Sequence, residues 1–162
     1  MGKEAAEQKA ASTLPRQGKN NSTLSSLLRF AYYYTDYVLG QFYIQVKYVL
    51  RGKVVVYDRY YFDFINDSKR SNISLPNWFT KAGYFFILKP TINFFLYADP
   101  EVILARKQEL DALAITTLTQ KYRSLFEALG NNNSKQLYQC INNIHLGETS
   151  SSIMHSIKTN AA

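Results

Sequence analysis

An acid and a base stand side by side at the end of an apolar run. Residues 54–57 are four β-forming side chains, and Asp58 and Arg59 follow directly. A carboxylate that closes a buried strand must be paired, hydrogen-bonded or metal-linked, because an unpaired buried charge is costly. Two interpretations stay open. Asp58 caps the next turn and pairs locally, or it faces the Mg²⁺ shell of a nucleotide while the planar fork of Arg59 binds a phosphate.

The elements around this pair follow from periodicity and caps. Apolar side chains recur at three- and four-residue steps from Leu24 to Val49, which predicts a long amphipathic helix with Ser22 as its N-cap and Gly52 as its stop. Further helices are predicted over 76–88, 99–110, 115–129 and 150–158. Buried strands are predicted over 53–57, 92–97 and 136–141. Strands that alternate with helices indicate an α/β fold, a parallel sheet with helices on both faces.

Ligands of such sheets bind beyond the carboxyl ends of the strands. That rule predicts one shared rim for Asp58, Arg59 and Asp99, the acid that follows the second predicted strand. Asp36 lies among aromatic residues on the long helix, where an exposed position and a role near a ligand are equally open. Tyr60 is a candidate wall of a base pocket, and Asp63 either orients Arg59 or caps a turn.

Composition limits the class of protein without choosing a function. The 162 residues are 46% hydrophobic and 19% charged, which suits a folded domain, and Lys and Arg outnumber Asp and Glu by 19 to 12. The net charge of +7 favours anionic partners of several kinds. Cys140 is the only cysteine, so we expect a reducing, cytoplasmic setting. No run approaches the ~18 apolar residues of a membrane span, so no membrane role is expected.

The string "LLRFAYYYTDYVLGQFYIQVKYVLRGKVVVYDRYYFDF" resembles the thymidylate kinase-like nucleoside monophosphate kinases, in which a long helix leads into a strand ending in Asp-Arg-Tyr. "INFFLYADPEVILARKQEL" is similar to the next strand, helix start and basic lid of that family, and the likeness extends over about residues 22–158. It implies a P-loop NTPase kinase-like fold and phosphoryl transfer from ATP, with Mg²⁺, to a nucleoside monophosphate.

The resemblance assigns roles to individual residues. Asp58 matches the acid near the acceptor phosphate and, through a water, the metal, and Arg59 matches the arginine that holds this phosphate. Arg106 and Lys107 match the lid cations that neutralise the transferring phosphoryl group. Asp36 resembles an acid of the matching helix. Without the resemblance, we would interpret Arg106 and Lys107 as solvent-exposed cations at the end of a helix.

The family's phosphate-binding loop, G-x-x-x-x-G-K-[ST], does not occur among the seven glycines of the chain. The sequence therefore predicts a kinase-like domain over 22–160 without its N-terminal strands, preceded by a polar, flexible segment over 1–21. We expect no catalysis by this chain alone. Nucleotides are the expected partners and nucleic acid is disfavoured, while acceptor identity and a homodimer stay open. The alternatives are an inactive module that binds nucleotides or polyanions, and an interaction module.

Overall fold

The long helix α2 (Thr23–Lys47) begins at the predicted cap, where the Ser22 hydroxyl accepts a hydrogen bond from the Ser25 amide at 3.3 Å. The structure is a computed structural model that describes residues 22–106, 110–132 and 135–160. After α2, a 3₁₀ turn, η2 (Val49–Arg51), ends at Gly52, which has the left-handed φ of 73° that favours glycine. The predicted N-cap of this helix is confirmed, whereas the α-helix ends at Lys47, before the predicted stop at Gly52, and the 3₁₀ turn lies between them.

The face that α2 buries differs from the prediction. Its buried side chains are Ser26, Phe30 and Gln41, and none of the apolar side chains of the predicted stripe is among them. Phe30 packs against Phe64 and Phe79, with ring centroids 6.1 and 5.3 Å apart. Aromatic residues near Phe30 supply the packing, so the stripe of leucines and valines faces outward.

The predicted buried strand at 53–57 is wrong. These residues form neither helix nor strand, and Val54 and Val56 are each 88% exposed. Strand-forming residues produce a strand only where a neighbouring strand pairs with them, and no pairing to this segment occurs in the described chain. The two charges therefore follow an exposed, irregular segment instead of a buried strand.

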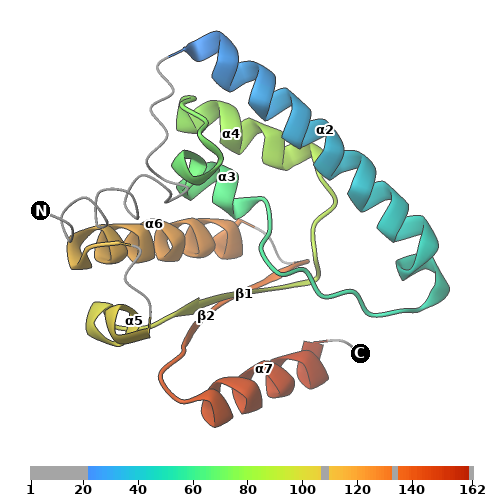
Figure 1. Cartoon of the computed structure of the whole chain (residues 1–162). Coiled ribbons are helices and arrows are strands. Elements are labelled where there is room, and N and C mark those ends of the chain that lie inside the picture. The colour runs from blue at the N-terminus through green and yellow to red at the C-terminus, as the bar shows by residue number, and fades with distance from the viewer. Residues whose placement is uncertain (1–21, 107–109, 133–134, 161–162) are drawn as a thin grey trace, which may run out of the picture. The chain divides into compact units, whose positions relative to one another are not determined.

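Four further short elements follow in the same part of the chain. They are α3 (Phe62–Asn66), the 3₁₀ turn η3 (Ser68–Ser71) and α4 (Asn77–Gly83), which continues into η4 (Tyr84–Phe86). Figure 1 shows α3 and α4 beside α2. The core that these elements share consists of Phe30, Tyr61, Phe62, Ile65, Ile73, Tyr84 and Ile87. The helix predicted over 76–88 thus forms, with a 3₁₀ end.

The chain divides after Leu88 into two units, and the second contains the sheet. Strands β1 (Ile92–Tyr97) and β2 (Leu137–Asn142) pair in parallel, with Ile92 opposite Leu137. Helices α6 (Ala112–Asn131) and α7 (Leu146–Asn160) cover opposite faces of this pair, and α5 (Pro100–Arg106) follows β1 (Figure 1). The observed sheet is therefore parallel, has helices on both faces and is α/β, as predicted.

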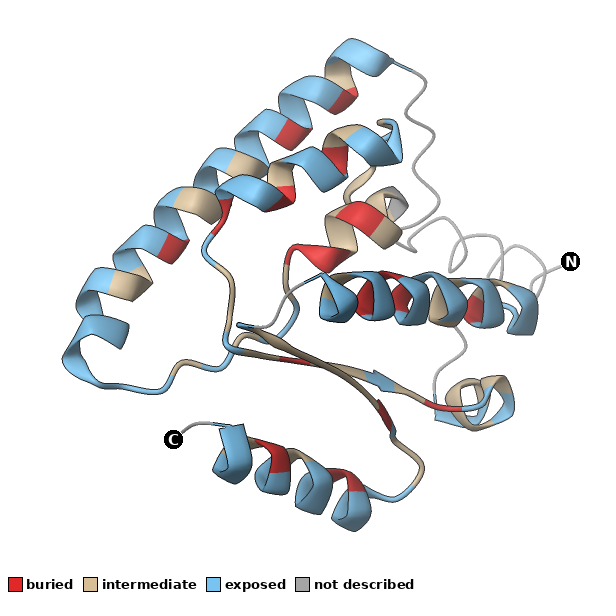
Figure 2. Ribbon diagram, turned by 180° about the vertical axis from the view of Figure 1, so that it is seen from behind, coloured by how far each residue is buried: buried red, intermediate tan, exposed pale blue. Residues whose placement is uncertain are grey.

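Aromatic stacking fixes α6 on its face of the sheet. The rings of Phe95 on β1 and Tyr122 on α6 stack with centroids 4.7 Å apart and planes 9° from parallel. Phe126 of α6 adds an edge contact to Tyr138 of β2. The buried residues of α6 are Ile115, Tyr122, Leu125 and Phe126. Figure 2 shows red, buried segments spaced along this helix. Apolar periodicity predicted this helix and its core face.

Three predictions remain open. The flexible segment predicted over 1–21 and the lid residue Lys107 lie outside the described residues. A single domain over 22–160 also stays a prediction, because each of the two units is described by itself.

Within the described ranges, no helix combines the length and the apolarity needed to cross a membrane.

Candidate functional site

The backbone of Arg59 adopts a conformation that arginine rarely takes. Its φ is 71°, in the left-handed region, where a non-glycine residue costs about 1–2 kcal/mol. Asn72 is the other described non-glycine residue with positive φ, at 53°, and asparagine tolerates this region through its short polar side chain. The long side chain of Arg59 offers no such local stabilisation of the left-handed conformation. Strained residues of this kind cluster at binding and catalytic sites, where the surrounding structure holds them.

Asp63 holds the guanidinium of Arg59. The Nη1 of Arg59 donates to the Oδ2 of Asp63 at 3.2 Å, across one turn from the strained residue to the first turn of α3. The Arg59 side chain is 54% exposed and that of Asp63 is 28% exposed. The pair thus orients one edge of the guanidinium and leaves its remaining donors toward solvent. This contact is the one that the sequence offered as an alternative to a turn cap.

Asp58 and Asp36 are both exposed carboxylates. In the described chain, neither side chain has a hydrogen-bond or ion-pair partner. The local pairing suggested for Asp58 is therefore not seen, and the acid stands next to the oriented Arg59. Asp36 lies on α2, and no contact joins it to the Arg59–Asp63 pair.

Tyr60 uses its hydroxyl to tie two segments together. It accepts a hydrogen bond from Gln41 Nε2 at 2.8 Å and donates one to the carbonyl oxygen of Leu88. Gln41 also accepts from the Leu88 amide at 3.2 Å. The Tyr60 ring meets that of Tyr57 edge-on, with centroids 5.7 Å apart. Tyr60 thus anchors the turn that carries Arg59, and its predicted place in a base pocket stays a prediction.

The buried polar groups of Gln41 and Tyr37 on α2 escaped the sequence reasoning. Gln41 is 4% exposed, and a glutamine inside an aromatic-rich helix is the pattern that could have revealed it. Tyr37 has a buried hydroxyl with no hydrogen-bond partner among the described residues. Burial raises the pKa of Tyr37 well above the usual phenol range, and the nearby Tyr60 phenol raises this pKa further. Tyr37 is therefore a neutral phenol at physiological pH.

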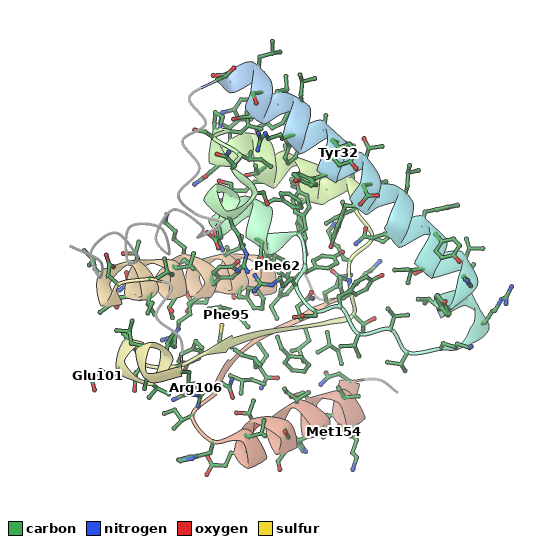
Figure 3. The ribbon with its side chains drawn as sticks, viewed as in Figure 1. Tyr32, Phe62, Phe95, Glu101, Arg106 and Met154 are labelled. Carbon is green, nitrogen blue, oxygen red and sulfur yellow. The ribbon has the colours of Figure 1, made fainter. Side chains whose placement is uncertain are left out.

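Arg106 lies at the end of α5, next to the carboxyl ends of the strands (Figure 3). Its guanidinium donates to the carbonyl oxygens of Asn143 at 3.2 Å and Ile144 at 3.0 Å, directly after β2. An arginine bound to two carbonyls stabilises the connection from β2 to α7. The side chain is nevertheless exposed, so its remaining donors face solvent.

The predicted rim that joins Asp58 and Arg59 to Asp99 loses its basis, because residues 53–57 form no strand and Asp58 and Arg59 therefore do not follow a strand of the sheet. The first two residues belong to the unit before Leu88, and Asp99 to the unit after it. What the structure brings together is the group Asp58, Arg59 and Asp63 with its anchor Tyr60.

A protein-held metal centre does not form among the described residues, where no three His, Cys, Asp or Glu side chains gather. Mg²⁺ that is bound to a nucleotide needs fewer protein ligands, because phosphates and waters fill most of its coordination shell and one or two carboxylates suffice. Asp58 is an exposed carboxylate next to a phosphate-binding type of side chain. Its chemistry therefore fits the predicted contact to nucleotide-bound Mg²⁺ through a water.

Comparison with known proteins identifies no relative of this chain. The chain matches no protein-family model, no curated protein and no solved structure. The likeness to thymidylate kinase-like enzymes therefore stays a hypothesis carried by the strings in the sequence.

Proposed function

We propose that the turn 58–60 with Asp63 binds the phosphate of a nucleoside monophosphate, as part of a thymidylate kinase-like protein. The observation that carries the proposal is the Arg59 guanidinium, which sits on a strained backbone and is oriented by Asp63. An oriented planar fork binds two phosphate oxygens with little loss of side-chain freedom. The resemblance to kinases with Asp-Arg-Tyr at this point supports the assignment, and ATP and Mg²⁺ would be the donor pair of a complete enzyme.

Each residue has a stated part in this proposal. Arg59 contacts the acceptor phosphate, and Asp63 positions Arg59. Asp58 contacts the waters of nucleotide-bound Mg²⁺. Arg106 and Lys107 keep the lid role only if Arg106 leaves its two carbonyl partners, because a guanidinium that donates to Asn143 and Ile144 has fewer donors for a phosphoryl group. We expect acceptor binding by this chain and no turnover, because the sequence contains no G-x-x-x-x-G-K-[ST] loop to hold the phosphates of ATP.

Titration calorimetry with dTMP and thymidine tests the binding. We expect dTMP to bind, thymidine to bind weakly or not at all, and Arg59→Ala to weaken dTMP binding by ~10-fold or more, as for a lost hydrogen bond to a charged group. Asp63→Asn should weaken it less. Arg51→Ala, at another exposed arginine, is the matched control and should leave dTMP binding unchanged.

One outcome would contradict the binding proposal, and another would contradict the expectation of no turnover. Salt-sensitive binding of single-stranded DNA without any dTMP binding would indicate a polyanion module that relies on the net charge of +7. ADP release that needs both ATP and dTMP and is lost in Arg59→Ala would show that the chain catalyses the reaction alone, contrary to the expectation of binding only.

A further inference from the structure

Exposed apolar residues alternate with cations at the C-terminal end of α2 and in the turn that follows it. Three apolar residues are each next to a cation in the sequence: Val46 beside Lys47, Leu50 beside Arg51, and Val54 beside Lys53. We call these six residues the basic tip. All six are exposed, with Leu50 at 70% and Val54 at 88%. Residues 37–57 contain no Asp or Glu, so the charge of this part of the chain is entirely positive.

The fold brings two of these cations together at the ring of Tyr48. Gly52, with its left-handed backbone, turns the chain back, and the Lys53 amide donates to the Tyr48 carbonyl oxygen at 3.1 Å. The ammonium groups of Lys47 and Lys53 lie 5.4 and 5.7 Å from the centroid of the Tyr48 ring. The ring attracts both cations but carries no charge that neutralises them. Two like charges at one ring therefore attract an anionic partner.

The end of a helix does not by itself account for this composition. A cation in the last turn interacts favourably with the C-terminal dipole of the helix, which explains Lys47. The dipole does not explain Lys53, which lies beyond the turn at Gly52. It also does not explain the exposed Leu50 and Val54, because aliphatic side chains are stabilised only when they leave water.

The position of the basic tip indicates a broad surface as its partner. Figure 1 shows α3 and α4 beside the first part of α2, whereas the other end of α2 projects beyond them, and Figure 2 shows that end as mostly exposed. At the boundary between lipid headgroups and acyl chains, aliphatic side chains leave water while lysine and arginine reach the headgroups. Tyrosine rings such as that of Tyr48 also favour this boundary. A nucleic acid would pair with the cations but leave Leu50 and Val54 in water.

We propose that the basic tip docks on the surface of an anionic phospholipid bilayer. Its three apolar side chains enter the headgroup region, and its three cations contact the anionic headgroups. Such a contact requires no membrane-spanning helix, so the proposal departs from the sequence-based expectation of no membrane role. It does not depend on nucleotide binding at Arg59.

Cosedimentation of the full chain with lipid vesicles tests the electrostatic part of the contact. We expect binding to vesicles of phosphatidylcholine with phosphatidylserine, little binding to phosphatidylcholine alone, and weaker binding as salt rises. Arg51→Glu should weaken binding to the mixed vesicles by ~10-fold or more, because it replaces a cation at the lipid surface by an anion. Lys121→Glu is the matched control: it makes the same change of charge at an exposed lysine of α6 and should alter the affinity by less than ~2-fold.

Substitutions of Leu50 test the apolar part of the contact. Leu50→Ser should weaken binding to the mixed vesicles by ~5-fold or more, because less apolar area leaves water. Leu113→Ser, at a 77% exposed leucine of α6, should leave it unchanged. The tryptophan fluorescence of Leu50→Trp should shift to shorter wavelength when mixed vesicles are added, and that of Leu113→Trp should not. Circular dichroism checks that each variant folds.

Three results would overturn the proposal. The first is an absence of binding to the mixed vesicles, and the second is binding that Arg51→Glu leaves intact. The third is binding that Leu50→Ser leaves unchanged, because the contact would then be electrostatic only. Binding of single-stranded DNA without vesicle binding, weakened by Arg51→Glu but not by Leu50→Ser, would assign the basic tip to nucleic acid instead.

Discussion

Arg59 shows how much one residue can constrain a candidate binding site. Its backbone is held in the left-handed region, and the Asp63 contact orients the guanidinium at the other end of the side chain. The Gln41–Tyr60–Leu88 hydrogen bonds hold the same turn from behind. The guanidinium is therefore already oriented, which would lower the entropy lost on binding of the proposed phosphate.

The strain at Arg59 predicts a difference between two substitutions. Both Arg59→Gly and Arg59→Ala remove the ion pair, but only glycine adopts φ of 71° at no steric cost. We expect the glycine variant to have a free energy of unfolding about 1 kcal/mol higher than the alanine variant, as measured by urea denaturation. Equal stability of the two variants would mean that Arg59 is not strained.

The three helices α2, α3 and α4 meet through tyrosines whose hydroxyls differ in their partners. The Tyr61 hydroxyl donates to the Thr80 carbonyl oxygen at 2.8 Å, and its residue is fully buried. The Tyr37 hydroxyl is buried without a partner among the described residues. Burial raises the pKa of both phenols above the usual range. Aromatic packing between these helices thus includes one satisfied and one unsatisfied polar group.

Removal of each hydroxyl should have opposite effects on stability. Tyr61→Phe leaves the buried Thr80 carbonyl without its donor, so we expect a loss of about 1 kcal/mol in the free energy of unfolding. Tyr37→Phe removes an unsatisfied buried group, so stability should stay unchanged or rise. Urea denaturation at pH 7 compares the two variants, and a larger loss in Tyr37→Phe would contradict the assignment.

The same phenols set a dependence on alkaline pH. Their pKa values are raised in the folded state, so their contribution to stability is complete below about pH 10, where unfolded tyrosines begin to ionise, and is lost as pH rises further. Tyr37→Phe should therefore lose less stability than the unchanged chain between pH 9 and about pH 11.

The molecule as a whole carries a net charge of +7 at pH 7, which falls to zero near pH 9.4. A positively charged molecule attracts anions such as dTMP. We therefore expect dTMP to bind more weakly at pH 9 than at pH 7, in calorimetry at constant low ionic strength. Equal affinity at the two pH values would contradict this expectation.

Periodicity and capping residues predicted where most helices and strands lie. Whether an apolar run forms a strand, and which face of a helix is buried, depends on contacts with residues distant in the sequence. β1 forms over 92–97 as predicted, because an apolar run followed by a capped helix finds β2 as a neighbour. The equally apolar run at 53–57 has no neighbouring strand and stays irregular. The buried side of α2 was missed because burial there follows aromatic contacts such as Phe30–Phe79, not the leucine spacing. For the candidate site, the Arg59–Asp63 contact was one of two options for Asp63, but the strain at Arg59 has no sequence signature.

One feature of the sheet bears on how it comes apart. The Leu137 amide donates to Thr91 and the Asn143 amide to Tyr97, so the odd-numbered residues of β1 turn their backbone groups toward β2. The amides of Phe94 and Leu96 then point to the other edge, where the described chain supplies no strand. Backbone hydrogen bonds therefore hold β1 along one edge only, the edge that faces β2. The stacking of Tyr122 on Phe95 adds a side-chain contact that opposes the separation of β1 from the sheet.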